Sequence, residues 1–309
     1  MRENGSWVNN TPDDIANVGM VTDAVWTDLN DDDRPDLVMV GDWMPVTIAF
    51  TVNFAQISEL YEIPNSSGWW NSIEAADLDG DGLEDLVLGN WGTNTRMQAS
   101  IDRPMRLLTK DFDSNGKSEF IIEWYPPAED QAFPFAQKRQ LHSQLPGLRK
   151  RTLRYSDYAK ANYESLFSAE ERDGAIEADA RELRSCVVWN MADGKVMLEP
   201  LPWQAQLNPQ FAVAVTDVNG DGRKDIWMGG NIYGVSPQVG RADAGRGTLL
   251  LNDGNRAWRY LSPASAGITV SGQVRDAQFV TLASGDQVLL VARNDAELLT
   301  YRVNQQITK

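Results

Sequence analysis

The sequence predicts an all-β protein, a β-propeller of about five four-stranded blades with a helical insertion near residues 134–183. Three observations lead to this fold class. An acidic nine-residue segment occurs four times along the 309 residues. Each copy lies between short apolar runs, which are typical of buried strands. The first two copies, starting at Asp28 and Asp77, begin 49 residues apart, about the length of one blade.

The most regular acidic segment, residues 77–85, carries Asp at positions 1, 3, 5 and 9 and glycine at position 6. Calcium takes roughly six to eight oxygen ligands at about 2.3–2.6 Å. Alternating carboxylates and the backbone carbonyl of position 7 supply most of such a shell, and glycine suits the sharp bend at position 6. The sequence therefore predicts Ca²⁺ as the cofactor. The predicted ligands at positions 1, 3, 5, 7 and 9 of the four loops are Asp28, Asn30, Asp32, Arg34, Asp36, Asp77, Asp79, Asp81, Leu83, Asp85, Asp111, Asp113, Asn115, Lys117, Glu119, Asp217, Asn219, Asp221, Arg223 and Asp225.

Two of the four loops depart from this pattern. The first has Asp33 in place of the glycine, and Asp tolerates a positive φ better than most residues. The third ends in Glu119, which is one methylene longer, and we expect a weaker or more irregular site there. Solvated acidic turns without metal remain the alternative, above all for these two loops.

The loops differ from the EF-hand, the common helical calcium motif. An EF-hand loop has about twelve residues, closes on a bidentate Glu and lies between helices. Here the twelfth residue of each loop is apolar: Met39, Leu88, Ile122 and Met228. Because the flanking runs read as short β segments, each loop is predicted to join two strands as a hairpin.

The predicted blades follow the chain in order. The first covers residues 20–62, and the pattern restarts at Trp69 for a second blade. The third loop comes only 34 residues after the second, so we expect the second blade to lack outer strands. Residues 134–183 are rich in Leu, Ala, Lys, Arg and Glu and read as two or three short helices, one of them opened by a capping box at Ser168.

We expect this insertion to interrupt the third blade, which would resume with strands 186–190 and 196–198 joined by a turn at Asp193-Gly194. The fourth blade is predicted over 211–260. The fifth, from 274 to 303, supplies only three strands. Strand Trp7-Val8, which follows a turn at Asn4-Gly5, is expected to be its fourth and to close the ring. The whole chain is thus predicted to be one propeller domain, residues 1–309.

The charge and composition of the chain limit the partners and the chemistry that we expect. A net charge of −16 argues against nucleic acid as a partner, since phosphate binding needs a basic face. The four loops hold sixteen acidic residues, and four divalent ions would bring the formal charge to about −8. Without metal these carboxylates would repel one another, so we expect cation binding to be coupled to folding. The single cysteine, Cys186, is predicted to be a buried, unreactive thiol.

No apolar run approaches the roughly 18–20 residues that cross a bilayer, and the first residues carry no signal peptide. The chain is therefore either cytosolic or a fragment or mature form of a longer protein. Cytosolic free calcium is too low for weak sites, so the metal loops favour the second interpretation.

The four acidic hairpins, each followed by residues like Asp85-Leu-Val-Leu-Gly89, resemble the FG-GAP/VCBS repeat family, the calcium-binding blades also found in integrin α-subunit propellers. Residues 145–149, 155–159 and 229–234 are similar to the carboxy-terminal part of VCBS-repeat surface proteins of Bacteroidetes-type bacteria. The resemblance covers nearly the whole chain outside the insertion. It implies a calcium-stabilised scaffold, located at the cell surface or in the periplasm, that recognises proteins or glycans. Members of that family are often longer at the amino end, so a truncated start is one expectation of the resemblance.

Two features are candidates for recognition. Trp43, Trp91 and Trp124 each follow the second strand of a predicted blade, and we expect repeated blades to bring them to one rim of the ring. There they would bind a sugar or a protein, although packing between blades is the commoner role. Residues 137–160 are basic and form either a docking patch or a solvated helical face. His142 is the only histidine, and we expect it to be a packing or solvent-exposed residue.

The sequence predicts a non-enzymatic calcium-binding scaffold for recognition of extracellular proteins or glycans. The alternative is a polysaccharide lyase or hydrolase built on the same propeller, because some lyases need only Ca²⁺, Lys, Arg or Tyr.

Overall fold

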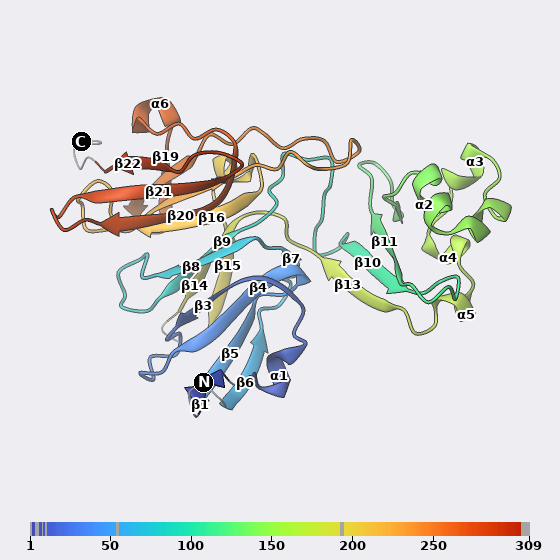
Figure 1. Cartoon of the computed structure of the whole chain (residues 1–309), viewed down its shortest axis with the longest axis horizontal. Helices are drawn as coiled ribbons and strands as arrows, with labels where there is room; N and C mark the ends of the chain where they lie inside the picture. Colours follow the sequence, from blue (N-terminus) through green and yellow to red (C-terminus); the bar gives the residue numbers. More distant parts are fainter. Residues whose placement is uncertain are drawn as a thin grey trace. The chain divides into compact units, whose positions relative to one another are not determined.

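The structure is a computed structural model that describes residues 2–3, 6–7, 9, 11–53, 56–191 and 195–303 (Figure 1). The chain forms two compact units, one made of residues 1–95 and 183–309 and one made of residues 96–182. Each is mostly β. The predicted turns at Asn4-Gly5 and Asp193-Gly194, as well as Val8, lie outside the described residues.

The first unit begins with an antiparallel sheet in the order β3 (Met20–Thr27), β4 (Asp36–Met44), β5 (Thr47–Asn53) and β6 (Gln56–Glu62). The short β7 (Gly68–Trp69) pairs with the end of β4. Residues of β4 and β5 are mostly buried because these two strands lie inside the sheet, whereas β6 at the edge is largely exposed. This sheet matches the predicted first blade.

The second sheet runs β15 (Val196–Pro200), β14 (Cys186–Asn190), β9 (Asp85–Gly89), β8 (Ser72–Ala76). It corrects two predictions. Strand β14 resumes the second blade, because its residues pair with β9 (Val187 with Val87), and the second blade keeps all four strands. Both strands are fully buried apolar runs, so hydrophobic pattern alone does not tell which sheet the chain rejoins after an insertion.

The third sheet contains β16 (Gln210–Thr216), β17 (Asp225–Gly230), β18 (Thr248–Gly254) and β19 (Ala257–Leu261) in chain order. It matches the predicted fourth blade. The last sheet has three described strands, β20 (Gln273–Thr281), β21 (Gln287–Asn294) and β22 (Leu299–Arg302). The predicted fourth strand is not at this place among the described residues. Instead β2 (Ser6–Trp7) pairs antiparallel with β1 (Arg2–Glu3), and each of these strands is two residues long.

The four sheets of the first unit are joined through their first strands: β3 contacts β8, β8 contacts β16, and β16 contacts β20. Apolar side chains fill the space between the faces of neighbouring sheets. Val38, Ile48, Leu86 and Val188 lie in the cluster between the first and second sheets. Val87, Trp189, Ile226 and Leu250 lie in the cluster between the second and third, and Trp227, Leu251, Leu289 and Val291 between the third and fourth. Face-to-face packing of four-stranded antiparallel sheets is the arrangement of propeller blades.

The second unit has its own sheet, in the order β12 (Phe133–Pro134), β11 (Glu119–Trp124), β10 (Met105–Lys110), β13 (Ile176–Ala180). The predicted insertion at 134–183 is therefore the helical part of a larger inserted unit, and the third acidic loop belongs to that unit. Among the described residues, the expected five blades correspond to four sheets of three or more strands in the first unit and one in the second.

Short helices lie between β12 and β13, where the composition of the segment predicts helices, but there are four α-helices and one 3-10 helix instead of the expected two or three. They are α2 (Lys138–Gln144), the 3-10 helix η1 (Pro146–Lys150), α3 (Tyr155–Tyr158), α4 (Tyr163–Leu166) and α5 (Ala169–Arg172). Their apolar residues Leu141, Leu148 and Leu166 pack with Leu108 and Ile121 of the sheet. The capping box at Ser168 is confirmed, since its side chain accepts a hydrogen bond from the Glu171 N–H.

Three further short helices belong to the first unit: α1 (Asp13–Ala16), the 3-10 helix η2 (Trp203–Gln206) and α6 (Pro263–Ala266). Throughout the described ranges, every helix is too short or too polar to span a bilayer.

Candidate metal centres

Each acidic loop joins the first two strands of a four-stranded sheet. Residues 28–36 connect β3 to β4, 77–85 connect β8 to β9, 111–119 connect β10 to β11, and 217–225 connect β16 to β17. In all four cases the last loop residue begins the second strand, most of whose residues are buried, although Phe120 of β11 is exposed. The prediction of hairpins flanked by strands, rather than helices, is confirmed.

Positions 4 and 6 of every loop have left-handed backbone. At position 6 the φ angle is 94° for Gly82 and 87° for Gly222, and Asp33 adopts 60° in the first loop. Asp33 therefore does replace the glycine, as expected from the tolerance of Asp for this region. Left-handed backbone at position 4, where φ is 57° at Asp31 and 58° at Ser114, was not predicted from the sequence. Glycine at position 4 of the second and fourth loops, Gly80 and Gly220, was the available signal.

The carboxylate at position 1 holds the turn together. Asp77 accepts hydrogen bonds from the backbone N–H groups of Gly80 (2.7 Å) and Gly82 (3.1 Å). The corresponding bonds to Asp217 from Gly220 and Gly222 are 2.7 and 2.8 Å long. These bonds wrap the backbone of each loop around the carboxylate at position 1.

The carboxylate at position 9 is buried and accepts two backbone hydrogen bonds. Asp85, only 1% exposed, accepts from Leu78 at position 2 (3.1 Å) and from Asn190 on the third strand (2.8 Å). Asp225 makes the same two bonds, and burial raises the pKa of both carboxyls to about 6, against the two hydrogen bonds that lower it. A cation beside these groups would stabilise their ionised form.

Two asparagine side chains connect loops of successive sheets in the first unit. The backbone N–H of Asn190 donates a hydrogen bond to Asp85. The side-chain amide of Asn190 donates another to the Leu29 carbonyl of the first loop, at 2.7 Å. Asn252, whose N–H binds Asp225, donates to the Leu78 carbonyl of the second loop, also at 2.7 Å. All of these groups are buried, so each bond fixes one loop against the next sheet. Neither asparagine was predicted from the sequence, because both lie in strands that are far along the chain from the loops they contact.

Two loops bring three carboxylates together. Ligand oxygens of Asp77, Asp79 and Asp85 lie within 4.8 Å of one another, and so do those of Asp111, Asp113 and Glu119. An all-oxygen set of this kind fits a hard cation such as Ca²⁺. The third loop, which we expected to be weaker because of Glu119, thus has one of the two converging sets. The other two loops have Asn30 and Asn219 at position 3.

Arginine side chains form ion pairs with carboxylates of three of the loops. Arg256 lies 3.3 Å from Asp79, Arg34 lies 3.6 Å from Asp32, and Arg223 pairs with Asp221. A bound cation would compete with these guanidinium groups for the same carboxylates. Among the described residues, no such ion pair involves the carboxylates of the third loop. The position-7 carbonyls of Arg34, Leu83, Lys117 and Arg223 remain predicted ligands.

The three predicted recognition tryptophans are in different surroundings. Trp43 and Trp91 are half-buried and both pack edge-on against Trp69, with ring centroids 5.0 and 5.4 Å apart. Trp69 itself was not singled out from the sequence. Trp124 belongs to the second unit, where it is 6% exposed and packs against Phe135 at 5.6 Å. A packing role, the commoner alternative, describes Trp43 and Trp91 best.

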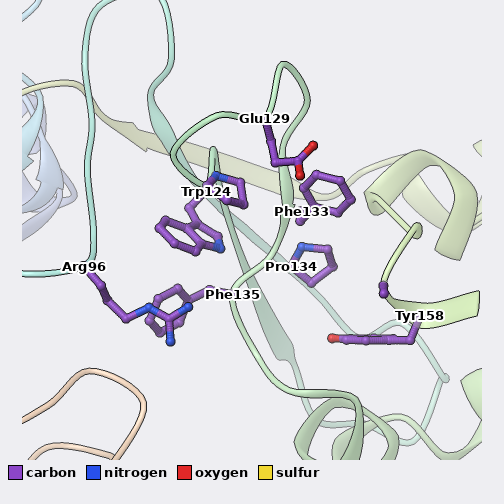
Figure 2. A pocket seen from close by; sticks show the side chains of 9 residues that line it. Arg96, Trp124, Glu129, Phe133, Pro134, Phe135 and Tyr158 are labelled. Atoms are coloured by element: carbon purple, nitrogen blue, oxygen red, sulfur yellow. The ribbon is translucent and has the colours of Figure 1, made fainter. Parts of the chain in front are cut away.

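A pocket of about 250 Å³ lies in the second unit beside Trp124 (Figure 2). It is lined by Arg96, Trp124, Pro126, Glu129, Phe133, Pro134, Phe135, Tyr158 and Ala159. A second cavity, about 550 Å³, lies in the first unit between strands β3, β8, β16 and β20. Its polar lining includes Asp23, Glu74 and Asp276, and burial raises the pKa of Asp23 and of Glu74.

The single cysteine and the single histidine of the sequence are both buried among neighbouring residues. Cys186 is fully buried in β14, as predicted. His142 is 9% exposed, its Nε2 lies 2.8 Å from the Thr152 hydroxyl oxygen, and burial lowers its pKa. These contacts agree with the expected packing role.

Residues 28–88 match the family model of the FG-GAP-like repeat, which covers the first two acidic loops. No curated protein matches the chain. Among solved structures, the chain is similar to the V. cholerae biofilm matrix protein Bap1, with 11% sequence identity and a TM-score of 0.31 over 91% of this chain. The chain spans 56% of the length of that protein. It is also similar to BBS1N in complex with ARL6DN, with 13% identity and a TM-score of 0.27, covering 94% of this chain and 82% of that one.

Proposed function

We propose that this chain is a calcium-stabilised propeller scaffold that recognises extracellular proteins or glycans and catalyses no reaction of its own. One observation carries the calcium part: the oxygens of Asp77, Asp79 and Asp85 converge within 4.8 Å in a loop whose last carboxylate is buried. The match of residues 28–88 to the FG-GAP-like repeat supports the same assignment.

The loop residues would hold the cation through side-chain oxygens at positions 1, 3, 5 and 9. The ion supplies positive charge that offsets the repulsion among the loop carboxylates. Because Asp85 is hydrogen-bonded to β14, a cation at this loop stabilises the hairpin and the third strand together. The ion is thus structural, and the recognition surface lies elsewhere on the sheets.

Thermal unfolding with and without metal tests this proposal. At a calcium concentration about 100 times the dissociation constant, binding to the folded state alone contributes about 2.7 kcal/mol, or roughly 5–10 °C in melting temperature. We expect excess chelator to remove this increment and Ca²⁺ to restore it. Asp79→Ala should reduce the increment, whereas Asp102→Ala, at an exposed position outside the loops, should not. An equal melting temperature in chelator and in calcium would contradict the proposal.

The proposed location is the cell surface or the periplasm, as in the Bacteroidetes-type surface proteins that the sequence resembles. Calcium sites with dissociation constants of about 10⁻⁴–10⁻³ M are filled outside the cytoplasm but not within it. A calcium dissociation constant below about 10⁻⁷ M would remove this argument, because such a site also fills at cytosolic levels.

The second candidate function is a polysaccharide lyase or hydrolase, and one observation favours it. The cavity between the first strands of the four sheets holds Asp23, Glu74 and Asp276, and Asp23 and Glu74 have raised pKa values, as a general acid requires. Incubation with acidic and neutral polysaccharides, followed by reducing-end detection, tests it. Product formed by the unaltered protein and lost in Glu74→Gln would favour the enzyme over the scaffold.

A further inference from the structure

The aromatic pocket of the second unit, lined by the nine residues given above, is built around the end of β11. Trp124 is the last residue of β11, and the chain then turns through Pro126 and Glu129 before returning as β12. In Figure 2, Trp124 and Phe135 lie on one side of the pocket, and Phe133, Pro134 and Tyr158 lie on the other. The pocket thus presents flat, apolar side chains on two sides.

The aromatic walls are held in place by specific contacts. Trp124 packs edge-on against Phe135, and the Arg96 guanidinium lies over both rings, 5.0 and 5.3 Å from their centroids. The Tyr158 hydroxyl donates a 2.6 Å hydrogen bond to the Ala136 carbonyl. Burial raises the pKa of Tyr158 to about 12, so this ring stays neutral. Rigid aromatic surfaces of this kind lose little entropy when a ligand binds.

Glu129 adds an exposed carboxylate at the mouth of the pocket. Its backbone N–H donates to the Pro126 carbonyl at 3.0 Å, and its own carbonyl accepts a hydrogen bond from Arg103 at 3.3 Å. Within this turn Ala128 has φ of 73°, a conformation that is unfavourable for a residue with a side chain. The surrounding bonds hold this strained turn and present Glu129 beside the aromatic side chains.

We propose that this pocket binds one pyranose ring of a neutral glycan. The ring would lay its C–H face on the aromatic walls, donate hydroxyl hydrogens to the Glu129 carboxylate and accept hydrogen bonds from the Arg96 guanidinium. The Glu129 carboxylate only accepts hydrogen bonds, and the Arg96 guanidinium only donates them. A ligand that contacts both groups and the aromatic side chains needs donors, acceptors and an apolar face, and a sugar ring has all three. This inference rests on the proposed recognition function and names its ligand class.

The size of the pocket favours one sugar ring over longer ligands. Its volume of about 250 Å³ is below the ~300–1,000 Å³ of pockets for drug-sized ligands. A proline-rich peptide also docks on aromatic side chains, but it needs an extended groove for several residues. Glu129 and Arg96 line the same pocket with opposite charges, so a ligand has no net charge to balance and a neutral ring matches better than a uronate.

The experiment uses the full chain in calcium buffer and saturation-transfer NMR with methyl glycosides of glucose, galactose, mannose and N-acetylglucosamine. Hexaproline is the competing probe. We expect at least one glycoside to receive saturation, and its affinity to fall about tenfold in Glu129→Gln and in Phe133→Leu. Two matched controls, Glu164→Gln on α4 and Phe120→Leu on β11, carry the same changes at exposed positions of the same unit outside the pocket.

Loss of affinity in the pocket variants but not in the controls supports the proposal. Absence of binding by all four glycosides, equal affinity in every variant, or binding of hexaproline alone would overturn it. Each of these failures leaves the calcium-dependent melting temperature untouched, so a wrong pocket and a wrong scaffold give different results.

Discussion

The second and third acidic loops contain the same cluster of three carboxylates but are fixed to different neighbours. In loop 77–85 the buried Asp85 is bonded to Asn190 of the third strand, and the Leu78 carbonyl receives the side chain of Asn252 from the next sheet. Loop 111–119 ends in Glu119, and its apolar position, Phe112, packs against Phe167 and Tyr163 of the helical segment, with ring centroids 4.6 and 6.1 Å away.

The same short acidic motif therefore occurs in two packing environments, one between neighbouring sheets and one between a sheet and helices. In the first unit a metal at the loop would stiffen the contact between sheets, since the asparagines connect successive loops. In the second unit a metal would stiffen the contact between a sheet and helices. Substitutions at the two loops test whether each loop stabilises a different contact, and the largest expected effect comes first.

Asp85→Ala is expected to be the most destabilising change. It leaves two buried N–H groups, those of Leu78 and Asn190, without an acceptor, and each costs about 1–3 kcal/mol. We expect a loss of about 3 kcal/mol in unfolding free energy, measured by urea denaturation in the presence of chelator so that metal plays no part. Asp102→Ala is the control. A loss below about 0.5 kcal/mol would show that these bonds do not hold the loop.

Phe112→Ala should act on the second unit alone. The Phe112 ring is half-buried, so we expect a cost of about 2 kcal/mol, less than the ~3–5 kcal/mol for a fully buried phenylalanine. Amide hydrogen exchange should report faster opening of β10, β11 and α4, with protection of β16–β18 unchanged. Equal loss of protection in both units would mean that they unfold together and that the comparison fails.

Asn252→Ala tests the connection between loops. It removes the amide that donates to the buried Leu78 carbonyl, at a cost of about 1–2 kcal/mol. Although Asn252 is not a predicted ligand, we also expect weaker calcium binding at loop 77–85. Asn94→Ala, which removes an exposed amide bond to the Leu207 carbonyl, is the matched control. Unchanged calcium affinity in Asn252→Ala would show that the loops act independently.

The smallest expected effect is the contribution of Glu123, in the second unit, to the change of unfolding free energy with pH. Burial raises the pKa of Glu123, against the hydrogen bond from the Tyr163 N–H and the charge of Arg106, which lower it. A raised pKa in the folded state means that folding takes up a proton, so this group stabilises at pH below about 4.5 and loses that contribution as pH rises. Glu123→Gln should therefore gain stability relative to the unaltered protein between pH 4 and 7. A constant difference across this range would contradict the assignment.

Much of the candidate metal site follows from the sequence because each loop carries its predicted ligands within nine residues. The turn geometry depends on Asp77 and the residues beside it, and the unusual Asp33 was interpretable because Asp tolerates left-handed backbone. The nature of the flanking strands is equally local, since short apolar runs follow each loop.

The parts that the sequence did not predict depend on residues far apart in the chain. Pairing of β14 with β9 joins residues about one hundred positions apart, and nothing in the run Cys186–Asn190 distinguishes the second sheet from the sheet of the second unit. Asn252 reaches a carbonyl 174 positions away. The pocket beside Trp124 needs Phe133 and Tyr158, which come together only when α3 packs near β12.

Calorimetric titration of calcium into the metal-free protein tests the central claim most directly. The account predicts saturable binding at two or more sites, with one site lost in Asp79→Ala and a different one in Asp113→Ala, while Asp102→Ala binds as the unaltered protein does. If no heat is released, or if both loop variants bind calcium with unchanged stoichiometry and affinity, the converging carboxylates are not metal ligands and the account is wrong.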